Sequence, residues 1–431
     1  MNDTSIKSVH ARRVWDSRGR PTVEAEVTLA DGSMGRGIAP AGASRGTREA
    51  IDLRDGGTKL GGLDVQRAVA NVNGEIAQAL AGRDANDQVV IDKILIDLDG
   101  TPNKARLGGN ATIAASLAVL HSSAASAGEP LWKRVSEGRP VSMPLPEIQI
   151  FGGGAHAGRR VDIQDFMVMA VGAKTFAEAL EMTGEVYLAA GALMKAAGKL
   201  AGVADEGGWW PMFDANDEAL VMLTRAIEHT GFKHSEMAIS LDIAASEFGS
   251  GGEGQYPGKY TLGLEKRVLD TGGMIDLLGT WLDAYPIVSI EDPLAEDDEA
   301  GLIEFTRRHG ARCQIIGDDY LVTNAARVEH AANIKAVNSA LIKLNQAGTV
   351  TETKAALDAA KKRGMSTLVS ARSGETEDVS ITHLAIGWNA GQLKVGSFAR
   401  SERMAKWNEA IRIEESTGAA FAGKLALPQM R

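Results

Sequence analysis

The chain has 431 residues, of which 44% are hydrophobic and 24% charged, and its net charge is −10 at pH 7. These values are typical of a globular protein in water, and the acidic balance excludes a broad nucleic-acid-binding surface. Cys313 is the only cysteine, which excludes an internal disulfide framework and fits a reducing cytoplasm. Because the N-terminus lacks a signal-peptide core and no uncharged apolar stretch reaches about 18 residues, we expect no membrane partner.

The first third of the chain predicts an α+β region. Residues 5–60 contain alternating apolar and polar runs that are typical of strands, and a glycine-rich segment without clear periodicity, GIAPAGASRG, follows them. Such loops are often functional. Residues 63–131 change to a helical period. Because Pro140, Pro144 and Pro146 then interrupt the chain, we predict an N-terminal α+β capping domain over residues 1–138.

Residues 139–431 have a different pattern, with short apolar runs alternating with helical stretches. From Asp318 onward the marked residues recur about every 25–30 residues, which is the length that a (β/α)8 barrel gives to each unit. The longer step between Asp242 and Glu291 indicates a glycine-rich hairpin inserted within residues 249–263. The sequence therefore predicts an α/β protein in which a capping domain precedes a (β/α)8 barrel.

Charged residues end several of these apolar runs. Asp242 ends ISLD, Glu291 ends VSIE, Asp318 ends IIGD, and Lys343 lies inside LIKLN. One such residue alone would more often meet solvent, but the strand ends of a barrel converge on one mouth. Three carboxylates gathered there require a cation, and hard oxygen ligands suit Mg²⁺. Beside a metal and away from water, Lys343 would have a lowered pKa and could act as a general base.

Four other segments carry candidate site residues. Residues 366–378 read as a buried strand that ends in Arg372-Ser373-Gly374, a combination suited to holding an oxyanion. Glu206 lies in an Asp-Glu-Gly-Gly turn and is a candidate acid. His156 lies in a glycine-rich loop, where a histidine is more often only solvated, and Gln164 and Asp165 follow it; the last candidate is a lid ligand, Ser44.

The chain resembles the enolase family from end to end. The motifs that carry the resemblance occur in the family's order: ARRVWDSRGRPTVEAEV, GASRG, DGTPNKARLGGNA, GGAHAG, DEGG, LDIAASEF, SIEDPLAEDD, GDD, LIKLNQAGT, SARSGETED and RSERMAKWNEAIRIEE. The resemblance implies an enolase-type barrel, a phosphorylated three-carbon acid as substrate, two Mg²⁺ ions, and self-association into a dimer or octamer.

The resemblance also implies roles for individual residues. Asp242, Glu291 and Asp318 match the ligands of the first Mg²⁺, and Ser44 matches a contributor to the second through the lid. The remaining matches are the base Lys343, the acid Glu206, the phosphate contacts Arg372 and Ser373, and Lys394 near the substrate carboxylate. We add His156 and Asp165 as catalytic candidates, and Gln164, Arg45 and Ala371 as substrate-binding candidates.

Four places depart from the family pattern. Ala371 stands where the family has a histidine, Asp165 where it has a glutamate, Arg45 where it has a threonine in the lid, and Trp209-Trp210 where it has Phe-Ala. Together they predict lost volume, a new cation for an anionic group and flat aromatic faces that could stack a nucleobase.

These departures indicate a larger second anionic substrate. A diverged enolase relative, carboxyphosphonoenolpyruvate synthase of phosphonate (phosphinothricin-type) natural-product pathways, fits that description, because it uses a phosphonoformyl group activated as a cytidine nucleotide. Our leading hypothesis from the sequence is therefore this activity with CMP-phosphonoformate. The alternatives are an ordinary phosphopyruvate hydratase and a non-catalytic binding protein on an enolase fold. Formation of phosphoenolpyruvate from 2-phosphoglycerate would support the first alternative, and absence of Mg²⁺ binding would support the second.

Overall fold

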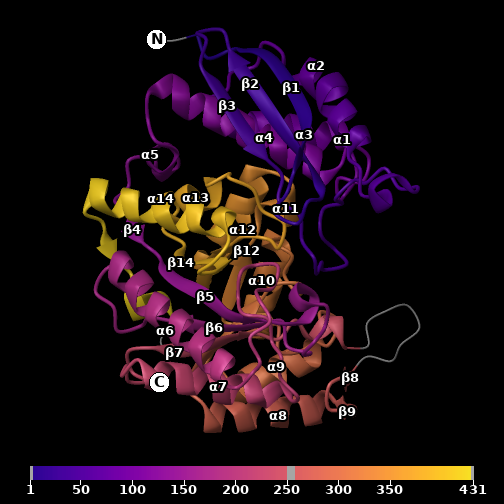
Figure 1. Ribbon diagram of the computed structural model, residues 1–431. Coiled ribbons are helices and arrows are strands. Elements are labelled where there is room, and N and C mark those ends of the chain that lie inside the picture. The colour runs from indigo at the N-terminus through magenta and orange to yellow at the C-terminus, as the bar shows by residue number, and fades with distance from the viewer. Residues whose placement is uncertain (1–2, 250–257, 429–431) are drawn as a thin grey trace.

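The computed structural model describes residues 3–249 and 258–428, which form a capping domain above a barrel (Figure 1). The fold class that the sequence predicted, an α+β cap followed by an enolase-type barrel, is confirmed. Between the two parts, α5 (Leu131–Ser136) ends before β4 (Ser142–Met143) begins, and the precise boundary after residue 138 stays a prediction. Within the described ranges, no helix combines the length and apolar character needed to cross a membrane.

The cap is an antiparallel sheet with helices packed on it. Its strands are β1 (Ile6–Trp15), β2 (Pro21–Leu29) and β3 (Met34–Ile38), and its helices are α1 (Gln66–Asn71), α2 (Ala77–Leu80), α3 (Gln88–Asp99) and α4 (Gly109–Ala127). Helix α4 packs against β2 and β3 and is rich in alanine and serine. Two glycines of β3 permit this approach: a Cβ at Gly35 would lie 2.1 Å from Ser122 N, and one at Gly37 would lie 2.5 Å from Leu117 Cβ.

The barrel is closed by eight strands in the order β10-β11-β12-β13-β14-β5-β6-β7. Their bounds are β5 Leu145–Gly152, β6 Asp165–Met169, β7 Ala238–Asp242, β10 Ile287–Glu291, β11 Gln314–Gly317, β12 Ser339–Ile342, β13 Ser366–Ser370 and β14 Gly391–Ser397. Neighbouring strands are parallel except that β6 is antiparallel to both β5 and β7. The simple strand–helix alternation that the sequence predicted is therefore wrong at this point.

The reversal of β6 has a local cause and a consequence for the site. Residues 153–164, between β5 and β6, contain a 3₁₀ turn but no α-helix, and parallel neighbours would need a longer crossover. Because β6 runs the other way, its first residue, Asp165, is paired with Asp242 at the end of β7 and with Gly152 at the end of β5. The reversal thus places the start of β6 at the barrel mouth.

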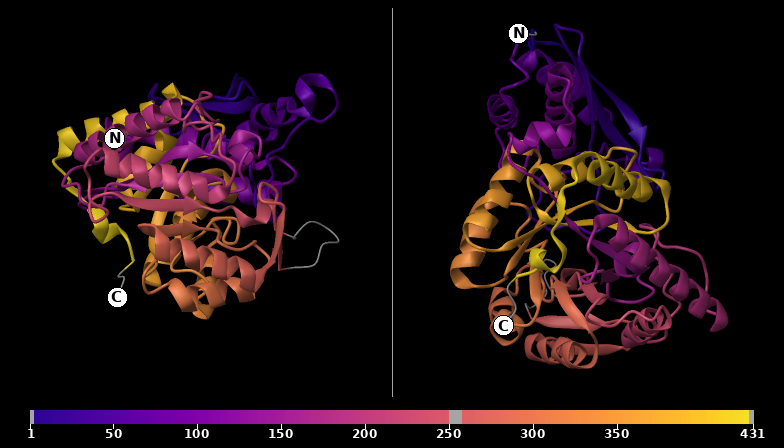
Figure 2. Two further views of the ribbon diagram at one scale, coloured as in Figure 1. Left: turned by 60° about the horizontal axis from the view of Figure 1, so that its bottom comes forward. Right: turned by 90° about the vertical axis from the view of Figure 1, so that its left-hand side faces the viewer.

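Helices surround the barrel, as the views in Figure 2 show. They are α6 (Phe176–Ala196), α7 (Asn216–His229), α8 (Thr271–Ala284), α9 (Glu299–His309), α10 (Ala325–Ile334), α11 (Leu344–Ala347), α12 (Val350–Lys362), α13 (Ser380–Gly387) and α14 (Ser401–Thr417). Threonine side chains accept a backbone N–H at the starts of α6 and α12. A hairpin does follow β7, formed by β8 (Lys259–Leu262) and β9 (Arg267–Asp270), but only β8 lies within the predicted range of residues 249–263; residues 250–257 of that range lie outside the described residues.

Candidate active site

A small, polar pocket lies at the mouth of the barrel. All of the predicted site residues line it except Glu291, Asp318 and Arg45; the lining residues are Ser44, His156, Gln164, Asp165, Glu206, Asp242, Lys343, Ser370, Ala371, Arg372, Ser373, Lys394 and Val395. They come from the ends of the barrel strands, from the loops above them and from the lid segment of the cap (residues 39–49). The fold therefore gathers residues that are more than 300 positions apart in the chain.

Asp242 and Glu291 end two neighbouring strands and share one lysine. They are paired in the register of β7 and β10, and Lys394 Nζ lies 3.0 Å from Asp242 Oδ2 and 2.7 Å from Glu291 Oε2. Burial lowers the pKa of Lys394, but the two carboxylates outweigh it and raise that pKa well above its usual value. The lysine is therefore charged and neutralises part of the acidic cluster.

Asp318 has a lysine partner of its own. The Lys343 ammonium contacts Asp318, and Gln346 Nε2 donates to the other Asp318 oxygen at 2.8 Å. The pKa of Lys343 is raised, because the attraction of Asp318 outweighs the effect of burial. The lowered pKa that we expect beside a bound metal stays a prediction, because here Asp318 carries its negative charge next to the amine without a cation. A cation bound to Asp318 would weaken that attraction.

The predicted metal ligands fit Mg²⁺ in chemistry. All three are buried carboxylates, and Glu291 Oε1 has no hydrogen-bond partner among the described residues. The described residues do not, however, bring the oxygens of Asp242, Glu291 and Asp318 within 4.8 Å of one another; the acidic group that meets this distance is Asp292, Asp318 and Asp319. The predicted ligands therefore form two separate sets: Lys394 holds Asp242 and Glu291, and Lys343 holds Asp318.

His156 is held between two carboxylates on the loop side of the pocket. Its Nδ1 lies 2.8 Å from Asp165 Oδ1, and its Nε2 lies 3.5 Å from Glu206 Oε1 and 3.4 Å from Ser373 Oγ. Although burial lowers the pKa of His156, Asp165 and Glu206 together raise it to about 9. His156 is 5% exposed, so the alternative that it is merely solvated is wrong. A protonated imidazole next to Glu206 can supply a proton.

Arg372 and Ser373 join the lid to the barrel. Arg372 Nη1 donates to Glu49 Oε2 at 2.9 Å, and its Nη2 donates to the carbonyl oxygen of Ser44 at 2.8 Å. Ser373 Oγ accepts the N–H of Ala43 at 2.9 Å. The guanidinium also lines the pocket, so the same side chain anchors the lid and faces the site. Its contact with a phosphate and the role of Ser44 at a second ion stay predictions.

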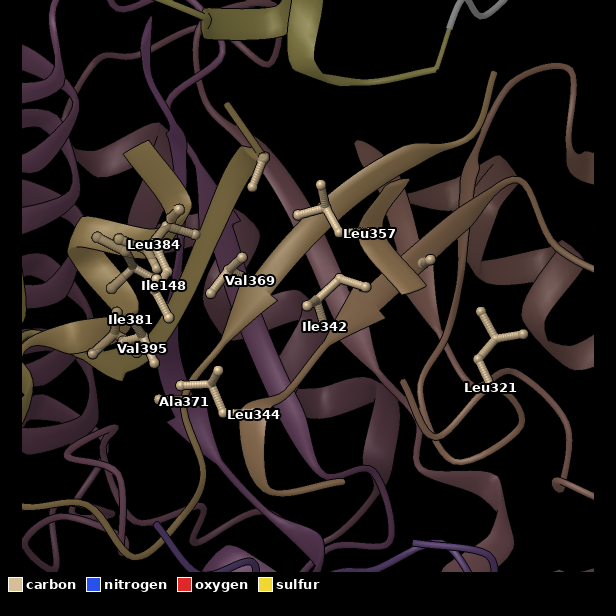
Figure 3. Packing of buried hydrophobic residues seen from close by; sticks show 14 of the residues in the cluster. Ile148, Leu321, Ile342, Leu344, Leu357, Val369, Ala371, Ile381, Leu384 and Val395 are labelled. Atoms are coloured by element: carbon tan, nitrogen blue, oxygen red, sulfur yellow. The ribbon is translucent and has the colours of Figure 1, made fainter. Parts of the chain in front are cut away.

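Ala371 and Asp165 are the departures from the family pattern that line the pocket. Ala371 belongs to a buried apolar cluster that also includes Leu344 and Val395 (Figure 3). Asp165 accepts the hydrogen bond of His156 and lies 3.7 Å from Lys394. The substitution at position 371 therefore leaves a small apolar wall where a histidine would add a polar ring.

The other departures lie away from the pocket. Arg45 is more than half exposed, with its guanidinium 3.9 Å from Asp52, and it does not line the pocket. Of the two tryptophans expected to offer flat faces, Trp209 turns one face to α6: its indole stacks on Tyr187 at 4.7 Å and 17°, and Gly191 packs against it; the ring of Trp210 stays a prediction. Trp209 Nε1 also donates to Tyr187 O at 2.9 Å. Trp209, three residues after Glu206, therefore anchors this segment to α6.

Two buried polar residues that the sequence analysis did not single out support the site. Asp292 accepts the N–H groups of Asp318 and Asp319 at 2.9 and 2.8 Å, and Gln149 contacts Asp165. Each carries a weak signal in the sequence: Asp292 directly follows a predicted ligand, and Gln149 is a lone amide in an apolar run. Neither signal indicates a partner, because the partner comes from another strand or loop.

Comparison with known proteins gives two family matches and a close relative. The family model described as "Enolase, N-terminal domain" matches residues 6–135, and "Enolase, C-terminal TIM barrel domain" matches residues 140–429. A curated protein named "Enolase 1" from Desulfitobacterium hafniense (strain Y51) is 47% identical over 422 residues, covering 97% of this chain and 96% of that protein.

Proposed function

Because the chain belongs to the enolase family, we propose that it catalyses the Mg²⁺-dependent interconversion of 2-phosphoglycerate and phosphoenolpyruvate. Membership of the family makes it an enzyme of the enolase superfamily, with a small phosphorylated acid as the expected substrate. The specific reaction is our proposal. We prefer it to the synthase activity with CMP-phosphonoformate, because a relative named as an enolase is 47% identical over 97% of this chain.

The observation that carries this proposal is that one pocket contains a base and a separate acid group. The base is Lys343, which directly follows β12. The acid group consists of His156, Asp165 and Glu206 on the loop side of the pocket. Elimination of water from a β-hydroxy acid needs both: a base to take the α-proton and an acid to protonate the departing hydroxyl. Lys343 accepts the α-proton, the β-carbon–oxygen bond breaks, and the hydroxyl leaves as water with a proton from the His156–Glu206 pair.

Cationic side chains and a metal would make removal of the α-proton feasible. The proton next to a carboxylate is very weakly acidic, and its loss creates a second negative charge. Lys394 and Arg372 add positive charge to the walls of the pocket. Mg²⁺ held by Asp242, Glu291 and Asp318 would supply concentrated positive charge for the developing dianion. A cation on Asp318 would also favour the neutral, basic form of Lys343.

A direct assay tests the proposal. The purified protein is incubated with 2-phosphoglycerate and Mg²⁺, and phosphoenolpyruvate is followed by its ultraviolet absorbance and by ³¹P NMR. We expect product with Mg²⁺ and none with EDTA. Lack of any phosphoenolpyruvate from protein that is folded and binds Mg²⁺ would overturn the proposal.

A second candidate is a synthase that also uses CMP-phosphonoformate, and Ala371 favours it. This alanine leaves an apolar wall in the pocket where the family has a histidine, which suits a changed substrate. Arg45 and Trp209 give it no support, because one lies outside the pocket and the other is stacked on Tyr187. The ³¹P NMR assay is repeated with both substrates. A new phosphorus resonance with release of CMP, seen only when both are present, would establish this activity, and its absence would exclude it.

We further propose, from family membership, that the protein forms a homo-oligomer and acts in the cytoplasm. Light scattering coupled to size exclusion measures the first, and a single 45.5 kDa species at micromolar concentration would overturn it. Cell fractionation measures the second.

A further inference from the structure

Gln149 lies between Asp165, the carboxylate that contacts His156, and the turn that carries Glu206. It belongs to β5, its side chain is buried, and its Nε2 donates to Asp165 Oδ1. Its Oε1 accepts the N–H of Gly208 at 2.9 Å, and Gly208 follows Glu206 by two residues. One neutral amide thus contacts both the carboxylate behind His156 and the loop of the other acid.

The surrounding chain leaves this amide little freedom to move. A Cβ at Gly208 would lie 2.4 Å from Gln149 Oε1, and one at Gly152 would lie 3.1 Å from the same oxygen. Ser397 Oγ holds the strand as well, by donating to the carbonyl oxygen of Gln149. Because the two glycines lie tightly against the side chain, its length and the position of its amide are set by packing.

Asp165 Oδ1 receives two donors, and their positions determine where His156 lies. His156 Nδ1 lies 2.8 Å from this oxygen, and Gln149 Nε2 approaches the same atom. Asp165 Oδ2 has no hydrogen-bond partner among the described residues, although Lys394 Nζ lies 3.7 Å from it. The orientation of the carboxylate therefore depends on the Oδ1 contacts. A long amide at position 149 on β5 meets a short carboxylate at position 165, the first residue of the paired strand β6.

We propose that Gln149 is a positioning residue whose side-chain length is matched to that of Asp165, so that the pair sets the geometry of His156 relative to Glu206. This inference rests on the proposed function for its activity test only. It predicts that lengthening one partner or shortening the other misplaces His156. It also predicts that changing both, so that their summed length is kept, restores the arrangement.

A double-mutant cycle tests the matched lengths. The variants are Gln149→Asn, Asp165→Glu and the double variant, with Gln392→Asn as the control because Gln392 is a buried glutamine on a barrel strand that does not line the pocket. We expect each single variant to lower kcat about 10- to 100-fold with KM changed less than about threefold, and the double variant to return within about fivefold of the parent. The control should keep the parent kcat.

The result that overturns the inference is additivity: a double variant that is as slow as the product of the two single effects. Melting temperatures identify variants that lose activity by unfolding. If Gln149→Asn does not fold, the comparison of Asp165→Glu with the double variant decides, because only matched lengths make the second substitution beneficial.

A measurement without substrate separates this inference from the proposed function. NMR titration of the His156 ring reports its environment, which is dominated by Asp165 and Glu206, with Asp242 contributing. We expect the midpoint to move by about one pH unit in each single variant and to return in the double variant. If it does so while no variant turns over 2-phosphoglycerate, the proposed function fails and the inference stands. An unchanged midpoint in all variants overturns the inference whatever the activity.

Discussion

The carboxyl ends of the barrel strands and the loops above them supply two halves of one site, and the two halves are held by different interactions. The strand-end half consists of Asp242, Glu291, Asp318, Lys343 and Lys394. Lys343 pairs with Asp318 at the end of the neighbouring strand, whereas Lys394 on β14 reaches Asp242 and Glu291, which belong to strands that are not its neighbours. The loop half consists of Ser44, His156, Glu206 and Ser373, whose partners come from other loops and from the cap. Parallel strands bring charges together directly, whereas loops depend on contacts between distant segments.

The comparison also separates two kinds of chemistry. In the strand-end half, lysines neutralise carboxylates at positions suited to a divalent cation, so a metal would compete with internal ion pairs. In the loop half, the carboxylates surround a histidine and raise its pKa to about 9. In the proposed reaction, the first half would stabilise negative charge on the substrate and the second would donate a proton.

A substitution in the strand-end half should lower turnover more than one in the loop half. Replacing Lys343 by methionine removes the base, and we expect kcat to fall about 10³- to 10⁴-fold. Binding of Mg²⁺ should persist, because Asp318 remains. Steady-state kinetics and calorimetric Mg²⁺ titration measure the two effects. Lys93→Met, on the exposed surface of α3, serves as the control, and near-parent activity of Lys343→Met would exclude Lys343 as the base.

Replacing Lys394 should destabilise the fold, because two buried carboxylates lose their cationic partner. In Lys394→Met, Asp242 and Glu291 lose the cation that they share, so the free energy of unfolding without metal should fall by about 3 kcal/mol. Mg²⁺ should raise the melting temperature more in this variant than in the parent, because it replaces the lost charge. Equal shifts in both proteins would show that these carboxylates do not bind the ion. Lys361→Met is the control.

The loop half should show its contribution in the pH dependence of stability. The pKa of His156 is raised to about 9, so its stabilising effect is complete below its unfolded value of about 6.5 and is lost as pH rises through 9. The pKa of Asp165 is lowered to about 2, so its effect is complete above about 3.8 and is lost only as pH falls through 2.

Asp165→Asn should therefore be less stable than the parent by on the order of 2 kcal/mol between about pH 4 and 6.5. The difference should shrink as pH rises through 9. Urea unfolding across this range measures it, with Asp97→Asn on the exposed side of α3 as the control. A difference that stays constant up to pH 10 would contradict the ion pair.

The smallest effect is expected at Arg45, in the lid. Its guanidinium is exposed and only 3.9 Å from Asp52, so Arg45→Ala should change kcat/KM for 2-phosphoglycerate less than about twofold. The same variant should lose more than tenfold with CMP-phosphonoformate only if the second candidate function holds and the lid turns Arg45 inward. Arg48→Ala, a neighbouring exposed arginine, is the comparison variant.

The three carboxylates of the strand-end half could be predicted from sequence because each ends an apolar run, and Lys343 because it lies inside another; barrel strands of one direction meet at one mouth, whereas Lys394 was implied only by the family resemblance. The direction of β6 could not, because the sequence does not mark whether a glycine-rich segment such as 153–164 reverses the chain. Nor does the sequence indicate the contact between Lys343 and Asp318, on which the pKa of the lysine depends when no cation is bound.

The departures from the family pattern show the same limit. Ala371 and Asp165 could be placed at the pocket from their neighbours in the motifs, and the structure puts both there. The expected face of Trp209 is covered by Tyr187, from a helix about twenty residues earlier, and Arg45 points to its own loop. Side-chain direction on a loop is decided by what packs against it.

The sequence by itself determined the cap and the barrel in their order along the chain, the family, and the acids at the strand ends, because these follow from local periodicity and from motifs along the chain. Tertiary structure alone decided that Asp165 sits at the mouth, that Gln149 joins it to the Glu206 turn, and that His156 is buried beside Ser373, 217 residues away. Those relations are contacts between distant segments. Their energies come from burial and hydrogen bonding that exist only once the barrel has closed and the cap covers it.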